Sequence, residues 1–115
     1  MRLEVCDIGG GSGSVATLSG EVGFGEVQEL KARLDSAHKL GGRALLLDLA
    51  NVSFIASDGL GVLIRVRTHA EQLGKMFLLV RPQGRILELL QKTQLTKIFT
   101  IYGTLEDAMA EMRSA

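Results

Sequence analysis

A continuous apolar run near the middle of the chain constrains the fold most. Residues 43–49 read Arg-Ala-Leu-Leu-Leu-Asp-Leu, and runs of this length and composition are typical of strands buried on both faces by helices. Helical patterns flank the run. Val27, Leu30, Leu34 and Ala37 recur at spacings of three and four within residues 25–40, and a similar pattern spans residues 57–73. The sequence therefore predicts a central parallel strand between two crossover helices.

The remaining elements complete an α/β pattern. We predict a hairpin from strands at residues 3–8 and 14–18 around the glycine turn 9–13, a strand at 76–80, a short helix at 86–90, a strand at 98–102 and a last helix at 105–112. Thr104 is the expected N-cap of that last helix, with Asp107 three residues on. The order β-β-α-β-α-β-α-β-α predicts one domain over residues 1–115, with a mixed, mostly parallel sheet of four to five strands packed with about four helices.

Charge and hydropathy narrow the classes of partner. Thirteen Lys and Arg balance thirteen Asp and Glu, whereas a nucleic-acid binder normally carries a basic excess, so we expect no nucleic-acid partner. The apolar runs are far shorter than the ~20 residues needed to cross a bilayer, so we expect no membrane insertion. Arg2, Glu4 and Asp7 interrupt the amino-terminal stretch where a signal peptide needs an apolar core. We therefore expect a cytoplasmic protein.

Few side chains suited to catalysis or metal binding are present. Cys6 is the single cysteine, and we expect it to be buried on the first strand, while no Cys and His cluster has metal-ligand spacing. His38 and His69 fall on predicted helices with no nearby nucleophile, and we expect both to face solvent. The turn at 9–13 lacks the Lys-Ser/Thr of a phosphate-binding loop. We therefore expect a binding module with no cofactor and no metal, and not an enzyme.

The segment 47–63 carries the functional signal. The predicted strand ends near Leu49, a loop follows, and Ser57-Asp58-Gly59 lies where the second helix begins. A strand end that faces a helix amino terminus is a common place for a site in α/β sheets, and the free N–H groups there attract anions. We expect Ser57 to be the N-cap, Asp58 to be a first-turn carboxylate, and Gly59 and Gly61 to permit close packing of the helix on the sheet.

These residues resemble the STAS domain family, and within it the stand-alone bacterial anti-sigma-factor antagonists. The family pattern has a strand ending in Asp-Leu, a loop with a buried Phe or Ile, and Asp-Ser-Ser/Thr-Gly-Leu-Gly entering a helix. Asp48-Leu49, Phe54-Ile55 and Ser57-Asp58-Gly59-Leu60-Gly61 match it here. Weaker likenesses lie in Leu18-Ser19-Gly20-Glu21-Val22 and in the segment 89–99.

The resemblance implies a switch. An unphosphorylated antagonist would bind an anti-sigma factor that is also a serine kinase, phosphorylation of the loop serine would break the complex, and a phosphoserine phosphatase would restore it. By position Ser57 is the matching phosphoacceptor. The resemblance also implies a docking face around the second helix, for which we name Glu21, Ala56, Ser57, Asp58, Gly59 and Arg65.

Three positions depart from the family pattern. Ala56 stands where the family has Asp before the serine, Asp58 stands where it has Ser or Thr, and Gly23 stands where it has Asp after Gly-Glu-Leu. Two readings follow. Either Asp58 takes over the polar role of the missing acids, or the chain is a constitutive STAS subunit of a transporter or scaffold assembly that is not phosphorylated.

Overall fold

The computed structural model describes residues 1–8, 12–40 and 42–114. Five strands and four α-helices are present in these ranges, together with two short 3-10 turns. Their bounds are β1 (Arg2–Asp7), β2 (Gly13–Val22), the turn η1 (Phe24–Glu26), α1 (Val27–Leu40), β3 (Ala44–Ile55), α2 (Ser57–Gln72), β4 (Met76–Val80), α3 (Gly84–Lys92), the turn η2 (Leu95–Lys97), β5 (Thr100–Tyr102) and α4 (Leu105–Ser114). The predicted order of strands and helices is confirmed.

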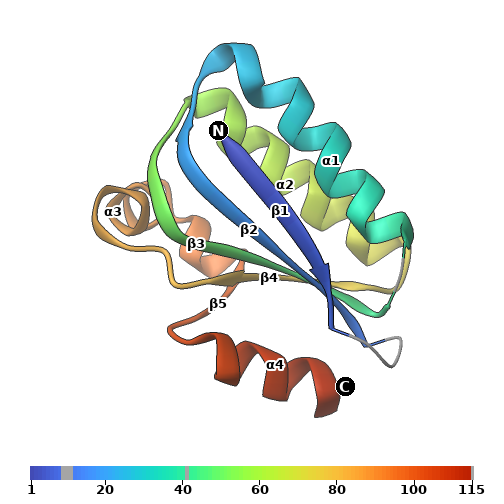
Figure 1. Ribbon diagram of the computed structural model, residues 1–115. Coiled ribbons are helices and arrows are strands. Elements are labelled where there is room, and N and C mark those ends of the chain that lie inside the picture. Colours follow the sequence, from blue (N-terminus) through green and yellow to red (C-terminus); the bar gives the residue numbers. More distant parts are fainter. Residues whose placement is uncertain (9–11, 41, 115) are drawn as a thin grey trace.

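The strands form one mixed sheet in the order β1-β2-β3-β4-β5 (Figure 1). β1 pairs antiparallel with β2, which confirms the hairpin, although the predicted turn residues 9–11 lie outside the described residues. The other three pairings are parallel. β3 and β4 are adjacent and run in register from Ala44 opposite Met76 to Asp48 opposite Val80, as the crossover through α2 requires.

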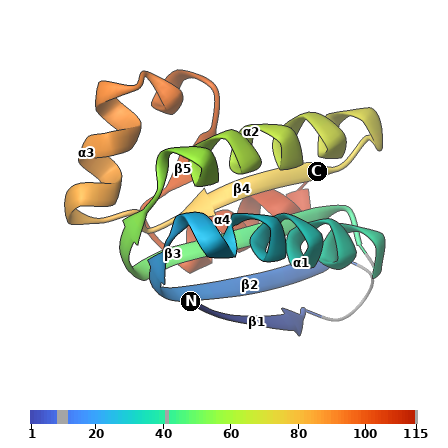
Figure 2. The same ribbon diagram turned by 90° about the horizontal axis from the view of Figure 1, so that it is seen from above.

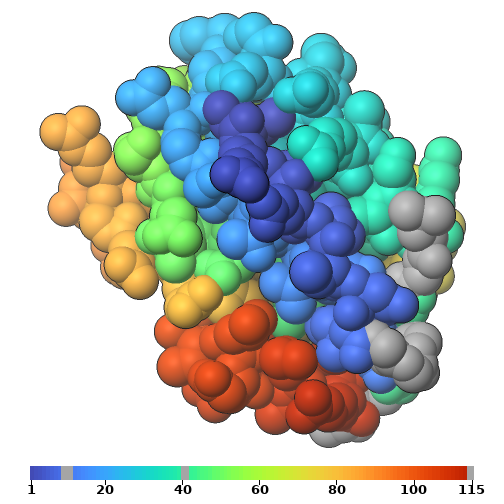
Figure 3. Space-filling model, viewed as in Figure 1, coloured from blue at the N-terminus to red at the C-terminus, as the bar shows by residue number. Residues whose placement is uncertain are grey.

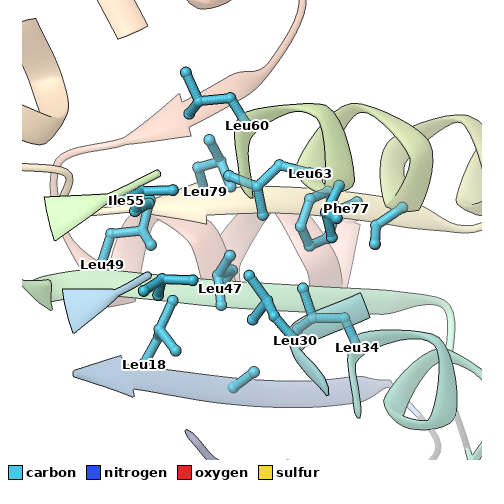
Figure 4. Close-up of a cluster of buried hydrophobic side chains, with 14 of the residues drawn as sticks. Leu18, Leu30, Leu34, Leu47, Leu49, Ile55, Leu60, Leu63, Phe77 and Leu79 are labelled. Atoms are coloured by element: carbon cyan, nitrogen blue, oxygen red, sulfur yellow. The ribbon is translucent and has the colours of Figure 1, made fainter. Parts of the chain in front are cut away.

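Helices cover both faces of the sheet. α1 and α2 lie side by side on one face, α4 lies on the other, and α3 lies beside the carboxyl ends of the parallel strands (Figures 1 and 2). The main core lies under α1 and α2, where side chains from β2, β3 and β4 point toward those from the two helices (Figure 4). Leu47 of β3 is fully buried at the centre of this cluster. A smaller cluster under α4 contains Leu46 and Met112.

The two inner strands are longer than the sequence pattern predicts. We expected strands that end at Leu18 and Leu49, followed after Leu49 by a loop, but β2 runs to Val22 and β3 runs to Ile55. The reason lies in α4, which covers only one end of its face of the sheet (Figure 1). Beyond that helix the strand meets solvent, so β3 carries the exposed polar residues Asn51 and Ser53 where a loop was expected.

The prediction that Cys6 is buried is wrong. Cys6 is exposed on β1, an edge strand that has only one neighbour, and its partner in the pairing is Val15. β1 lies at the margin of the sheet, outside the layer that α1 forms over the inner strands (Figure 2). The residues of this strand are visible on the surface in Figure 3. None of the described helices therefore shields the Cys6 thiol.

His38 also departs from expectation. We expected it to face solvent, but it is 1% exposed, with its ring centroid 5.8 Å from that of Phe77 in β4. His69, by contrast, is about one-third exposed on α2. His38 follows the buried Leu34 by four residues, so both lie on the inner face of α1. That spacing is the sequence signal that would have placed His38 correctly.

Candidate functional site

The candidate site lies where β2 and β3 end together at the amino terminus of α2. Val22 pairs with Ile55 as the last residues of the two strands, and the Ala56 N–H donates a hydrogen bond of 2.8 Å to the Val22 carbonyl. This bond holds the start of α2 against the turn that follows β2. The carboxyl edge of the parallel sheet thus fixes the position of the next residue, Ser57.

The turn after β2 is held by Glu26. The Gly23 N–H donates to the Glu26 carboxylate at 3.2 Å, and the Glu26 N–H donates to the Gly23 carbonyl at 3.0 Å. The amino group of Met1 forms an ion pair with the same carboxylate at 2.9 Å. Phe24 is part of this anchored turn and is 68% exposed. The aromatic ring is therefore displayed beside the start of α2 on a fixed support.

Ser57 is the first residue of α2 and not its cap. Ala56 occupies the N-cap position with extended backbone angles, φ −63° and ψ 154°, so the prediction that Ser57 caps the helix is wrong by one residue. Within the described part of the chain, the Ser57 hydroxyl has no hydrogen-bond partner, and the residue is exposed. The first N–H groups of a helix lack partners within the helix, so an anion on this hydroxyl would find donors nearby.

The next residues follow the expected pattern in part. Asp58 is exposed in the first turn of α2, as predicted, where the helix dipole favours a carboxylate. Gly59 is buried, and a Cβ atom there would lie 2.6 Å from a methyl carbon of Ile55, which confirms close packing. At Gly61 the same test position has no described atom within 4 Å apart from its chain neighbours and the nearby backbone of α2 itself. Close packing therefore does not explain Gly61, and its missing side chain leaves a hollow.

Two hollows flank Ser57. The first is an apolar groove of about 440 Å³ between α3 and the end of β3, and the second is a polar hollow of about 380 Å³ over Gly61. Ser57 and Phe24 line both hollows. The sequence motif has a buried Phe or Ile at this point, and Ile55 is the buried residue, while Phe54 is 48% exposed in the groove. Ser57 therefore stands between the two hollows, with the exposed rings of Phe24 and Phe54 in the groove beside it.

The structure brings three of the predicted docking residues together. Ser57, Asp58 and Arg65 line the polar hollow over Gly61. Glu21 is exposed on β2 and pairs across the strands with Phe54, next to the groove. Ala56 and Gly59 are both buried, Ala56 in the lining of the groove and Gly59 against Ile55.

Sequence reasoning missed the residues that make up most of the groove. Phe24 and the α3 residues Arg85, Ile86, Leu89 and Lys92 line it but were not singled out. The signal for the four α3 residues is the strongly amphipathic pattern of that helix, which places cations beside an apolar stripe. The pattern alone could not show that this stripe extends beyond the core to the surface near Ser57.

Clusters of metal-ligating side chains and membrane-spanning helices are both absent from the described ranges. In the described ranges, no three His, Cys, Asp or Glu side chains come together as a metal site would need. Among the same residues, no helix combines the length and apolar character that a bilayer span requires.

Comparisons with known proteins agree with the fold described above. The STAS domain family matches residues 9–108. A Thermotoga neapolitana protein named "Putative anti-sigma factor antagonist TM1081 homolog" is 34% identical over 73 residues, which cover 64% of this chain and 65% of that protein, so the match spans less than two thirds of the relative's length.

Two solved structures extend the comparison to the whole fold. The crystal structure of an anti-sigma factor antagonist from Mycobacterium paratuberculosis is 31% identical, with a TM-score of 0.82 over 97% of this chain and 93% of that one. The anti-sigma factor antagonist SpoIIAA in its unphosphorylated form has a TM-score of 0.83 over 99% of this chain and 98% of that one. At 19% identity, this second likeness concerns the fold alone. With a five-stranded mixed sheet, four helices and a family match over most of its length, the chain belongs to the STAS domain family.

Proposed function

We propose that the chain is an anti-sigma factor antagonist that binds a serine-kinase anti-sigma factor through the surface around Ser57, and that phosphorylation of Ser57 ends this binding. The observation that carries the proposal is the exposed Ser57 hydroxyl, which engages no other described residue and stands between two hollows. The relatives named as anti-sigma factor antagonists support the same role. The activity is regulatory binding in the cytoplasm, without catalysis by this chain.

The switch follows from electrostatics. A phosphate on Ser57 adds about two negative charges at the centre of the docking surface. At the amino terminus of α2 that charge is tolerated by the domain itself, because the helix dipole favours anions. Across an interface the same charge would have to be buried without compensation, which costs several kcal/mol. Phosphorylation would therefore release the partner while leaving the antagonist folded.

The direct test is phosphopeptide mapping with the cognate anti-sigma kinase and ATP. We expect one phosphate, on Ser57, and none on the Ser57→Ala variant. Ser53 on β3 and Thr68 on α2 are the internal controls, because both are exposed hydroxyl residues that the proposal leaves unmodified. Phosphate on either of these residues with Ser57 unmodified would contradict the site assignment.

One observation favours a second function, that of a constitutive STAS subunit in a larger assembly. Asp58 is exposed directly beside Ser57, and its carboxylate would repel a phosphate there. Ala56 and Gly23 add no acid of their own. On this alternative the partner would bind the same surface, but no kinase would label Ser57 in the complex.

A further inference from the structure

The groove beside Ser57 is apolar and open. Ile55 and Ile86 are buried in its lining, Leu89 is half-buried, and the rings of Phe24 and Phe54 are exposed beside it. A closed apolar cavity of about 150 Å³ holds one benzene ring, so about 440 Å³ has room for two or three apolar side chains. Exposed apolar surface of this kind, rimmed by polar residues, is typical of protein interfaces.

The rim of the groove on α3 carries two unpaired cations. Arg85 and Lys92 both line the groove, and neither forms an ion pair with another described residue. Glu88 lies between them on the same rim and leaves a net charge of one positive. Arg85 stands in the first turn of α3, where the helix dipole disfavours a cation and the first turn has no acidic residue. Its charge therefore does not serve the stability of α3.

We infer that this groove binds an acidic amphipathic helix of the anti-sigma partner, an inference that rests on the proposed function. Arg85 and Lys92 are seven residues apart, or about 10 Å along the axis of α3. A docked helix with two acidic residues at the same spacing would pair with both cations. Apolar residues three and four positions after the first acid would then face Phe24, Phe54 and Leu89.

The groove also connects to the switch. Ser57 lines the same groove, so a phosphate there would stand close to the acidic face of the docked helix. Like charges repel, and the phosphate would also compete for the Arg85 guanidinium. Phosphorylation would then act on the acid-binding groove as well as on the rest of the surface around Ser57.

A pair of synthetic helical peptides tests the inference. Both are about three turns long and carry Leu at the two apolar positions, and they differ only in having Glu or Lys at the two positions seven residues apart. We expect the Glu peptide to bind the full-length protein at least tenfold more tightly in a low-salt titration followed by nuclear magnetic resonance. The shifted amide signals should lie in α3, at the end of β3 and at Phe24.

Charge reversal supplies the decisive variant. Arg85→Glu combined with Lys92→Glu should invert the preference, so that the Lys peptide binds more tightly. The matched control is Lys39→Glu with Arg113→Glu, which makes the same change in net charge at exposed positions of α1 and α4 and should keep the original preference. Circular dichroism confirms that both variants are folded.

Several results would overturn the inference. These are binding of neither peptide, equal binding of both, shifts that fall on β1 or α4, an unchanged preference after charge reversal, or a dimer of the chain that covers the groove. The peptide titration uses no kinase and no ATP. It can therefore fail while Ser57 is phosphorylated by the partner, and it can succeed where Ser57 is never labelled, so the groove and the proposed function are separately testable.

Discussion

The guanidinium of Arg81 binds the buried carboxylate of Asp48 through two nitrogens. Arg81 Nε lies 3.3 Å from Asp48 Oδ1, and Nη2 bonds to Oδ2. The Ala50 N–H donates a third hydrogen bond to this carboxylate at 3.0 Å. Asp48 is 4% exposed in β3, and Arg81 follows β4 with a positive φ of 55°. The carboxylate raises the pKa of Arg81, and the pair joins the middle of β3 to the end of β4.

Removing the guanidinium should destabilise the domain. Arg81→Ala leaves a buried carboxylate without its counter-ion, and because the Arg81 side chain is 40% exposed we expect a loss of about 2 kcal/mol, below the range for fully buried pairs. Arg81→Gly should be about 1 kcal/mol more stable than Arg81→Ala, since only glycine adopts positive φ without strain. Urea titration measures both. Equal stability of the two variants would show that the backbone at residue 81 is unstrained.

Two glycines of α2 make a matched pair with opposite outcomes. Gly59→Ala should cost about 1 to 3 kcal/mol, because the new methyl group would lie 2.6 Å from Ile55. Gly61→Ala meets open space within the same helix and should stabilise the domain by up to about 1 kcal/mol. The denaturant midpoints of the two variants, compared with that of the wild type, measure both changes in stability. A stabilising Gly59→Ala would mean that α2 does not pack closely on the end of β3.

The central leucine tests the core. Leu47 is fully buried between the helices and the middle of the sheet, so Leu47→Ala should cost about 2 to 5 kcal/mol as it leaves a cavity. Val5→Ala on the exposed edge strand is the control, since Val5 is 41% exposed. We expect that variant to lose less than about 1 kcal/mol. A loss of similar size for both would contradict the two-sided burial of β3.

The pattern of apolar residues predicted the element order because the inner half of β3 is buried on both faces and reads as a continuous run. It failed beyond Leu49 because a strand buried on one face only, with Asn51 and Ser53 toward solvent, resembles a loop. The position of Ser57 was predicted to within one residue, since helix starts are marked by several residue types at once. The groove on α3 could not be predicted, because it depends on how distant segments meet.

His38 makes the stability depend on pH. Burial lowers its pKa from 6.5 to about 4, with contributions in the same direction from Lys75 and His69 and an opposing one from Asp35. Its Nε2 is buried without a hydrogen-bond partner in the described structure. Between pH 6.5 and 4 the unfolded chain takes up a proton that the folded chain does not, so the folded state loses stability as the pH falls. The full loss is about 3 kcal/mol.

Urea titrations at pH 7.5, 6, 5 and 4 measure this dependence. Each unit of difference between the pKa of His38 in the unfolded and in the folded chain corresponds to roughly 1.4 kcal/mol of stability. His38→Leu should remove most of it, since no group is left to protonate at that position. His69→Gln is the control and should keep it, because His69 is partly exposed. The same slope in the wild type and in His38→Leu would assign the pH dependence to the carboxylates instead.

The last prediction concerns Ser57 itself. Ser57→Asp places a carboxylate in the first turn of α2, which the helix dipole favours, so the fold should remain intact. Binding of the anti-sigma partner should weaken at least tenfold, or about 1.4 kcal/mol, because the new charge lies between the two hollows. Ser57→Ala should bind as the wild type does. Thr68→Asp is the charge-matched control on the exposed face of the same helix and should leave binding unchanged. Calorimetric titration compares the four proteins, and tight binding by Ser57→Asp would favour the constitutive subunit over the switch.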